Sequence, residues 1–288
     1  MVLVALAVVW ALRARRDRRL AVAIASLGLA APWLCGAEPL LATALAAHAA
    51  LFVLMRTVEL VRERVPRTAR WQLASLLLVL DLRALQTGPR HFPWADAGRL
   101  LGYLLLAWSS ACVVVDVAPA QGAAGCTLRW LAGAALVYAV ADAHGHALTV
   151  VLAAIGRRGP PMQDVPIRAR SVREFWGRRW NLNVSRWIRR NVHRPAARRV
   201  GPVAGVAAAF VFSAAAHVYL VLGLDELWVV FAMGAFFVVQ GAAAVLEGRL
   251  GVQRWPRWAQ HAWTIAAVAG PSPLFVEPFL RVVLPSPG

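Results

Sequence analysis

Long runs of apolar residues alternate with short polar stretches along the whole chain. Most of the runs have the length, about 20 residues, that a helix needs to cross the hydrocarbon core of a bilayer. We therefore expect an all-α fold, a polytopic transmembrane helical bundle that forms a single domain over residues 1–288. The apolar runs are residues 2–12, 20–35, 37–55, 71–82, 99–118, 127–155, 202–223, 227–246 and 258–282.

The positions of the arginines orient these runs. Five arginines fall in residues 13–19, five in 56–70 and thirteen in 157–199, whereas several other connections hold none. The positive-inside rule predicts that the Arg-rich loops are cytoplasmic. The run 71–82 is short, which is typical of a re-entrant or interfacial helix. If it does not cross, loops 56–70 and 88–99 share one side, and the pattern predicts about eight crossings with both termini outside the cytoplasm.

The composition agrees with a membrane protein. The chain is 60% hydrophobic and 16% charged, with a mean hydropathy of +0.59, which is too apolar for a soluble domain. The formal net charge is +17, but this charge lies in loops between apolar runs, where it favours anionic membrane lipid over nucleic acid as a partner. The first run carries its charges after its apolar residues, which favours an anchor over a cleaved signal peptide. The cysteines, Cys35, Cys112 and Cys126, show no paired or metal-binding spacing.

One long stretch, residues 156–201, is too polar to span and forms a cytoplasmic Arg/Trp-rich loop with an interfacial helix. It begins with RRGPPMQDVPIRARS, whose prolines favour an extended connection. Ser171 followed three residues later by Glu174 is the pattern of a capping box, so we expect a helix to start there.

A helix over residues 173–190 would be both aromatic and basic. At about 100° per residue it separates its aromatic and apolar side chains from its arginines, with Asn181 and Ser185 at one border. Two interpretations are open: an amphipathic helix at the membrane surface, or the floor of a cavity where arginines bind phosphates and Asn181 faces inward. The aromatic arc is Trp176, Trp180, Asn183, Val184, Trp187 and Ile188, and the basic arc is Arg178, Arg179, Arg186, Arg189 and Arg190.

A histidine lies well inside an apolar run. His217 occurs in AGVAAAFVFSAAAHVYLVLGL, which holds no charged residue, and an ionisable group at membrane depth is a functional hypothesis by default. The small residues before it, Ser213 among them, leave room for a ligand or for a closely packed helix. Two interpretations are open: a neutral histidine bonded to a neighbouring helix, or a general base. His144 and His146 lie on different faces of one helix, so we expect no metal ion between them.

Two segments together resemble the membrane-bound O-acyltransferase superfamily. The first is SVREFWGRRWNLNVSRWIRRNVHRP, residues 171–195, and the second is FVFSAAAHVYL with its embedded histidine. The FWGRRWN part resembles the wax-synthase-like branch, and FFVVQGAAAVLEGRL and PSPLFVEPFLRVV resemble the C-terminal helices of the family. The resemblance covers about residues 165–285, and the N-terminal half is similar to the family only in hydropathy.

The resemblance implies transfer of an acyl group from acyl-CoA, as cosubstrate, to a hydroxyl within the bilayer, without a metal or another cofactor. Asn181 and His217 match the catalytic pair of the family, with His217 as base, which makes residues 202–285 the catalytic helices. The substrate-binding residues that we expect around this pair are Trp176, Arg178, Arg179, Trp180, Arg186 and Ser213.

The residues point to the acceptor less specifically than to the acyl donor. We expect a long-chain or other hydrophobic alcohol and a wax-type ester as product. Acylation of a sterol, a glycerolipid or an envelope glycan is an alternative, and so is a non-enzymatic transporter or scaffold. Ala214 to Ala216 precede the histidine, where plant members of the family commonly have Gly-Leu-Met or Gly-Leu-Trp. All 31 lysine-or-arginine positions are arginine, which is typical of a GC-rich coding sequence. This bias and the short chain favour a bacterial inner membrane as the location.

Overall fold

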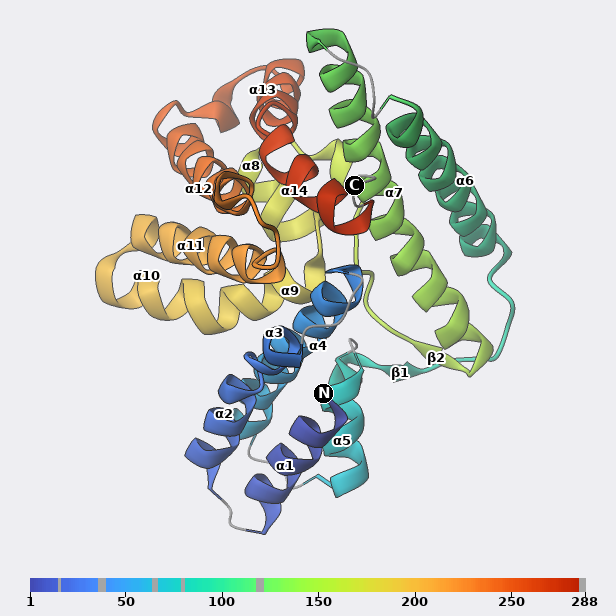
Figure 1. Cartoon of the computed structure of the whole chain (residues 1–288), viewed down its shortest axis with the longest axis vertical. Helices are drawn as coiled ribbons and strands as arrows, with labels where there is room; N and C mark the ends of the chain where they lie inside the picture. Colours follow the sequence, from blue (N-terminus) through green and yellow to red (C-terminus); the bar gives the residue numbers. More distant parts are fainter. Residues whose placement is uncertain (15–16, 36–39, 64–66, 79–80, 118–121, 285–288) are drawn as a thin grey trace.

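The part of the protein that the structure describes is mainly helical. The structure, a computed structural model, describes residues 1–14, 17–35, 40–63, 67–78, 81–117 and 122–284. Within these residues the strands are two residues long and form one antiparallel pair (Figure 1), so the predicted all-α class is confirmed. The α-helices and strands are α1 (Val2–Arg13), α2 (Arg18–Leu27), α3 (Ala31–Cys35), α4 (Leu40–Arg62), α5 (Ala69–Leu77), β1 (Gln86–Thr87), α6 (Trp94–Asp116), α7 (Ala123–Ala154), β2 (Arg157–Arg158), α8 (Val172–Glu174), α9 (Leu182–Ile188), α10 (Arg194–Val200), α11 (Pro202–Leu220), α12 (Leu227–Arg249), α13 (Arg257–Ala269) and α14 (Pro273–Val283).

Tighter and wider helical turns join these elements. Three are 3₁₀ turns, η1 (Leu82–Ala84), η2 (Pro166–Arg168) and η5 (Val252–Arg254). Two are π-helical, η3 (Phe175–Arg179) and η4 (Arg189–His193), and both lie in the Arg/Trp-rich region.

Six helical stretches among the described residues are long and apolar enough to cross a membrane, which supports an integral multi-pass protein. Pairing α13 with α14, which meet at a bend of 44°, raises the number to seven. The prediction of about eight crossings is not reached, because α1 has only 12 residues, about 18 Å at 1.5 Å per residue. Helix α5, with nine residues, is too short to span, as expected. The six stretches are Arg18–Cys35, Leu40–Arg62, Trp94–Asp116, Ala123–Ala154, Pro202–Leu220 and Leu227–Arg249.

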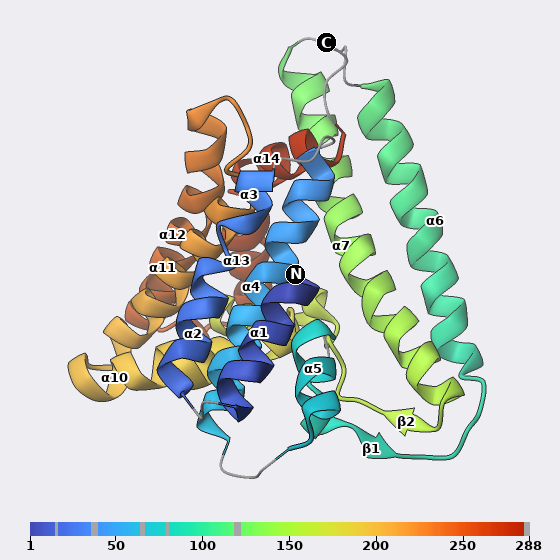
Figure 2. The ribbon, with the colours of Figure 1, turned by 60° about the horizontal axis from the view of Figure 1, so that its bottom comes forward.

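The spans form three groups around the Arg/Trp-rich region. Helices α1, α2, α4 and α5 pack together, α6 lies along α7, and α11 to α14 make the third group (Figure 1). Figure 2 shows the end of α4, the β1–β2 pair and the start of α6 at the same end of the molecule. This agrees with the expectation that loops 56–70 and 88–99 share one side of the membrane.

Each group has its own apolar core. Val8 and Val53 lie in the core of the first group, and Phe236 and Phe237 in that of the third. Helix α14 joins the second and third groups, because Leu280 packs against residues of α6 and α7. Many outward side chains are large and apolar, as lipid-facing helices require.

The single helix predicted over residues 173–190 is wrong, because the chain breaks between Trp180 and Asn181. Ser171 does cap the N-terminus, since its Oγ accepts the Glu174 N–H at 2.9 Å. The π turn η3 then ends at Arg179, and Asn181 adopts a left-handed φ of 41° from which α9 starts afresh. The arcs calculated for one continuous helix therefore do not describe the side-chain directions after Trp180. The proline-rich stretch before Ser171 is irregular apart from β2 and η2, as expected.

Candidate functional site

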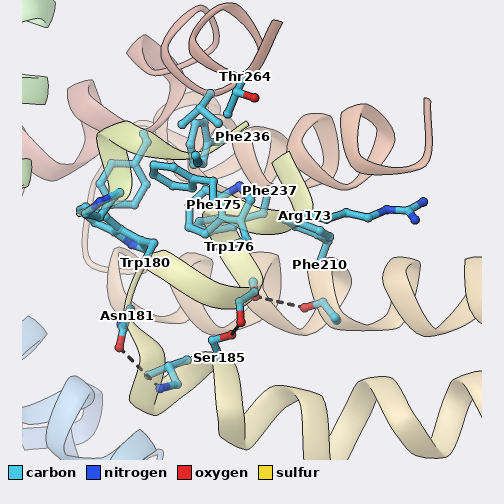
Figure 3. Close-up of a pocket in the computed structure, with 18 of the residues that line it drawn as sticks. Arg173, Phe175, Trp176, Trp180, Asn181, Ser185, Phe210, Phe236, Phe237 and Thr264 are labelled. Carbon is cyan, nitrogen blue, oxygen red and sulfur yellow. Dashed lines mark hydrogen bonds between the residues drawn. The ribbon is translucent and has the colours of Figure 1, made fainter. Parts of the chain in front are cut away.

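A cavity of about 700 Å³ lies between the Arg/Trp-rich region and the helices α7, α11, α12, α13 and α14. Its volume suits a small-molecule or lipid site. Most of the lining is apolar and aromatic, and a few polar side chains interrupt it. Figure 3 shows the aromatic rings on one side of this space and Asn181 and Ser185 near the start of α9.

His217 of α11 lines this cavity. Its Nδ1 lies 2.8 Å from the Ser213 carbonyl oxygen, one turn earlier in the same helix. A carbonyl can only accept, so Nδ1 carries the proton of the neutral ring, and Nε2 is left with a lone pair. The ring also packs on Phe237, with 4.1 Å between the ring centroids. The bond from His217 is thus made within its own helix, and the nitrogen suited to take up a proton is the other one.

Asn181 lines the same cavity, although it lies 36 residues earlier in the chain. It is one of two non-glycine residues with a left-handed φ among the described residues, a conformation that asparagine tolerates better than most residues. Its Oδ1 accepts a long bond of 3.5 Å from the Val184 N–H, which caps α9 (Figure 3). Its own N–H donates to Gln163 Oε1 at 2.8 Å. The side-chain NH₂ is the group left to donate to a ligand.

The two predicted tryptophans form part of the cavity wall. The Trp180 ring stacks on Phe175, with 5.6 Å between centroids and 12° between planes, and approaches Tyr138 of α7 at 6.1 Å. Trp176 lies in a cluster of rings that also includes Phe210 of α11. Neither indole is the exposed headgroup anchor of the interfacial interpretation, because both are partly buried.

The three predicted arginines do not share one environment. Arg178 lines the cavity and is exposed. Arg179 turns away and binds the Glu174 carboxylate at 2.7 Å, and Arg186 reaches the Pro161 carbonyl at 3.4 Å. Neither Arg179 nor Arg186 belongs to the lining. The π turn η3 sets the direction of Arg179, and the break after Trp180 changes the direction of Arg186.

The ion pair with Arg179 lowers the pKa of Glu174. Partial burial raises the pKa of Glu174, but hydrogen bonds from the Arg170 N–H and the Arg179 guanidinium outweigh burial and hold this pKa below its usual value. Glu174 therefore stays ionised at neutral pH and keeps Arg179 engaged.

Three basic residues at the cavity were missed as site residues by the sequence reasoning: Arg173, Arg189 and His193. Burial and then the nearby Arg189 and Arg194 lower the pKa of His193. Its Nδ1 is buried without a hydrogen-bond partner among the described residues. The π turn η4, which brings Arg189 and His193 to the cavity, has no clear sequence signal, although both residues stand in the resembling segment.

Ser213 also lines the cavity, one helical turn before His217. Its Oγ donates to the Ala209 carbonyl oxygen at 3.0 Å, so the hydroxyl keeps a lone pair for a ligand. Of the DAHGH histidines, His146 bonds Asp96 of α6 at 2.9 Å. No group of three His, Cys, Asp or Glu side chains in the described part of the chain could hold a metal ion.

The N-terminal helices hold the Arg/Trp-rich region in place. Trp187 is 8% exposed and donates its indole N–H to the Met55 carbonyl at 2.9 Å. Close by, the buried Glu59 of α4 binds Arg83 at 2.6 Å and Arg190 of η4 at 3.4 Å. These contacts explain how a half of the chain with no family-like motif still positions the site.

Part of this chain is similar to known proteins. Residues 159–239 match the family model described as "Membrane bound O-acyl transferase family". The probable long-chain-alcohol O-fatty-acyltransferase 1 of Arabidopsis thaliana is 33% identical over 116 residues, which are 38% of this chain and 34% of that protein.

Two further Arabidopsis thaliana proteins of this name are similar. Probable long-chain-alcohol O-fatty-acyltransferase 7 is 35% identical over 36% of this chain and 34% of its own length, and number 3 is 32% identical over 42% and 40%. The chain thus spans about a third of the length of the first relatives it matches. Residues 159–239, which supply Asn181, His217 and most of the aromatic wall, are therefore similar to the membrane bound O-acyl transferase family.

Proposed function

We propose that the protein is a membrane-bound acyltransferase that moves a fatty acyl group from acyl-CoA to the hydroxyl of a long-chain or other hydrophobic alcohol. The observation that carries this proposal is that Asn181 and His217 line one largely apolar cavity. The names of the plant relatives, long-chain-alcohol O-fatty-acyltransferases, support the choice of acceptor. The product is then a wax-type ester.

In this proposal His217 is the general base. An alcohol is a weak nucleophile at neutral pH, and Nε2 of the imidazole takes its proton as the oxygen attacks the thioester carbonyl carbon. The new C–O bond forms, the C–S bond breaks, and the imidazolium returns the proton to the leaving thiolate. The bond from Nδ1 to the Ser213 carbonyl supports this role, because it favours the tautomer with a free Nε2.

Asn181 serves the developing oxyanion. Its side-chain NH₂ donates to the carbonyl oxygen as negative charge builds up in the tetrahedral intermediate. Arg178 at the cavity, joined by Arg189, attracts the phosphates of the CoA. The chemistry needs no metal or resident cofactor, because the imidazole and the amide supply the base and the oxyanion donor.

The experiment that tests the proposal is ester formation by the purified protein in detergent or vesicles. Labelled acyl-CoA is offered with a panel of fatty alcohols, a sterol, a diacylglycerol and a sugar acceptor. Labelled ester from a fatty alcohol supports the proposal, and ester only from another acceptor selects that alternative. No ester from any acceptor, with folded protein, would favour the non-enzymatic transporter or scaffold.

The location is a further part of the proposal. The exclusive use of arginine favours a bacterial inner membrane, although the relatives reported above are plant proteins. Fractionation of the native host with an antibody to the chain tests this directly.

A further inference from the structure

Gln240 is a fully buried polar residue in the middle of a membrane span. It lies in α12, its exposure is 0%, and it is not part of the cavity lining. An amide in such a position is costly unless its polar atoms are bonded. The Oε1 atom accepts the indole N–H of Trp176 at 3.0 Å, and Nε2 donates to the Ala267 carbonyl of α13 at 2.9 Å. The two partners fix the amide orientation, because an indole can only donate and a carbonyl can only accept.

The residue that Gln240 holds is the centre of the aromatic wall. The Trp176 ring makes edge or tilted contacts with its neighbours Phe210, Phe236 and Phe237, with centroids 5.8 to 6.2 Å apart. Figure 3 shows these labelled rings gathered together beside the cavity. Phe237 in turn packs on His217. Trp176 is therefore one ring away from the histidine.

Ring packing alone does not define how the indole is turned. Contacts between aromatic rings tolerate several edge-to-face arrangements of similar energy. The indole N–H is different, because turning it away from Gln240 would leave a buried donor without an acceptor. The hydrogen bond thus selects one orientation of Trp176 and with it the shape of the wall.

We propose that Gln240 is a specificity-determining residue, which acts through Trp176 to set the width of the acyl site beside His217. This inference rests on the proposed function. Trp176 belongs to the same π turn η3 as Arg178, which attracts the CoA phosphates in the proposed function. We therefore place the fatty acyl chain of the acyl-CoA, rather than the alcohol, beside the indole. Because the indole lies one ring from His217, it contacts the acyl chain near the thioester carbon. It therefore discriminates between straight and branched chains rather than between chain lengths.

The test is a competition between palmitoyl-CoA and 2-methylpalmitoyl-CoA for one fatty alcohol. The ratio of the two esters formed in one sample does not depend on how much of a variant is folded. We expect the wild type to prefer the straight chain by about tenfold or more, the scale that one methyl group is worth in a fitted pocket. Gln240→Met keeps the side-chain size, removes both hydrogen bonds and should lower this preference by at least about threefold. Trp176→Phe, which removes the same bond from the other side, should also lower it.

A double variant and a matched control complete the experiment. If Gln240 acts through Trp176, the double variant Gln240→Met/Trp176→Phe should show the same ratio as Trp176→Phe alone. Gln260→Met is the control, because Gln260 of α13 donates to the Gln253 and Trp255 carbonyls and does not line the cavity. Its ratio should equal that of the wild type.

Three outcomes would overturn the inference. An unchanged ratio in Gln240→Met, with a changed one in Trp176→Phe, would show that the indole keeps its place without Gln240. Unchanged ratios in both variants would remove Trp176 from the acyl site. Absence of ester from the wild type with either donor would overturn the proposed function itself, and the inference with it.

Discussion

Asn181 has a structural role and a proposed catalytic role, and different substitutions can separate the two. Its backbone is left-handed and its Oδ1 caps α9, so it has a structural duty, and its NH₂ is the proposed oxyanion donor. Asn181→Asp keeps an oxygen for the cap and a residue type that tolerates the left-handed region, but it replaces the donor by a carboxylate. Asn181→Ala loses all three properties.

The magnitudes follow from the geometry. A left-handed backbone costs an alanine about 1–2 kcal/mol, and the cap adds about 0.5 kcal/mol, the low end of its range, because the bond to the Val184 N–H is as long as 3.5 Å. We expect Asn181→Ala to destabilise the protein by about 2 kcal/mol and Asn181→Asp by less than about 0.5 kcal/mol. Loss of an oxyanion donor lowers kcat by about 10² to 10³, so both variants should be nearly inactive.

The assay pairs ester formation with thermal unfolding in detergent for each variant. Asn181→Asp is the decisive one, because its loss of turnover cannot be attributed to a lost cap. Turnover by Asn181→Asp within about threefold of the wild type would refute the donor role and leave Asn181 as a purely structural residue.

Three further predictions concern stability, substrate binding and pH. Glu59→Gln should destabilise by about 1–3 kcal/mol, because it removes the carboxylate that binds the buried Arg56 at 2.7 Å and Arg83 at 2.6 Å, while Asp81 still binds Arg83. Glu63→Gln, which breaks an i,i+4 pair with Arg67, should cost less than about 0.5 kcal/mol. Equal denaturation midpoints for the two variants would contradict this. Arg178→Ala should raise the KM for acyl-CoA at least about tenfold with little change for the alcohol, and Arg186→Ala should change neither; equal KM values for the two variants would contradict the assignment. Because the pKa of His193 is lowered in the folded state, the unfolded state binds more protons as the pH approaches and passes the ordinary value of 6.5. The free energy of unfolding should therefore fall as the pH drops from about 7.5 toward the folded-state pKa. His193→Gln should reduce this dependence of stability on pH in thermal unfolding, and an unchanged dependence would contradict the prediction.

The fold class could be predicted from the sequence because membrane-spanning helices are long runs of apolar residues. Unbroken apolar runs of about 20 residues favour helices, because a spanning strand is about half as long and alternates in polarity. The short segment at α5 was identified by its length. The number of crossings was less accurate. The break between α13 and α14 falls at Gly270 and Pro271 within one apolar run, and hydropathy does not register a bend.

Most of the predicted residues do line the cavity, but the directions of two arginines were not predictable. His217 stood out because an ionisable group in an apolar span needs a reason. The directions of Arg179 and Arg186 depended on a continuous helix, and the π turn at η3 and the left-handed Asn181 removed that basis. Contacts from distant parts of the chain, such as Gln240 to Trp176 and Glu59 to Arg190, had no local signal at all, since they arise only from tertiary packing.

The measurement that tests the central claim most directly is ester formation by His217→Ala beside His261→Ala. Both histidines are partly buried and both place Nδ1 at a backbone carbonyl, Ser213 at 2.8 Å and Ala169 at 3.1 Å, but only His217 of the two lines the cavity. If His217 is the base, His217→Ala should lose at least about 10² of the wild-type rate from labelled acyl-CoA and a fatty alcohol, whereas His261→Ala should stay within about threefold. Full activity of His217→Ala, or equal losses in the two variants, would contradict the account.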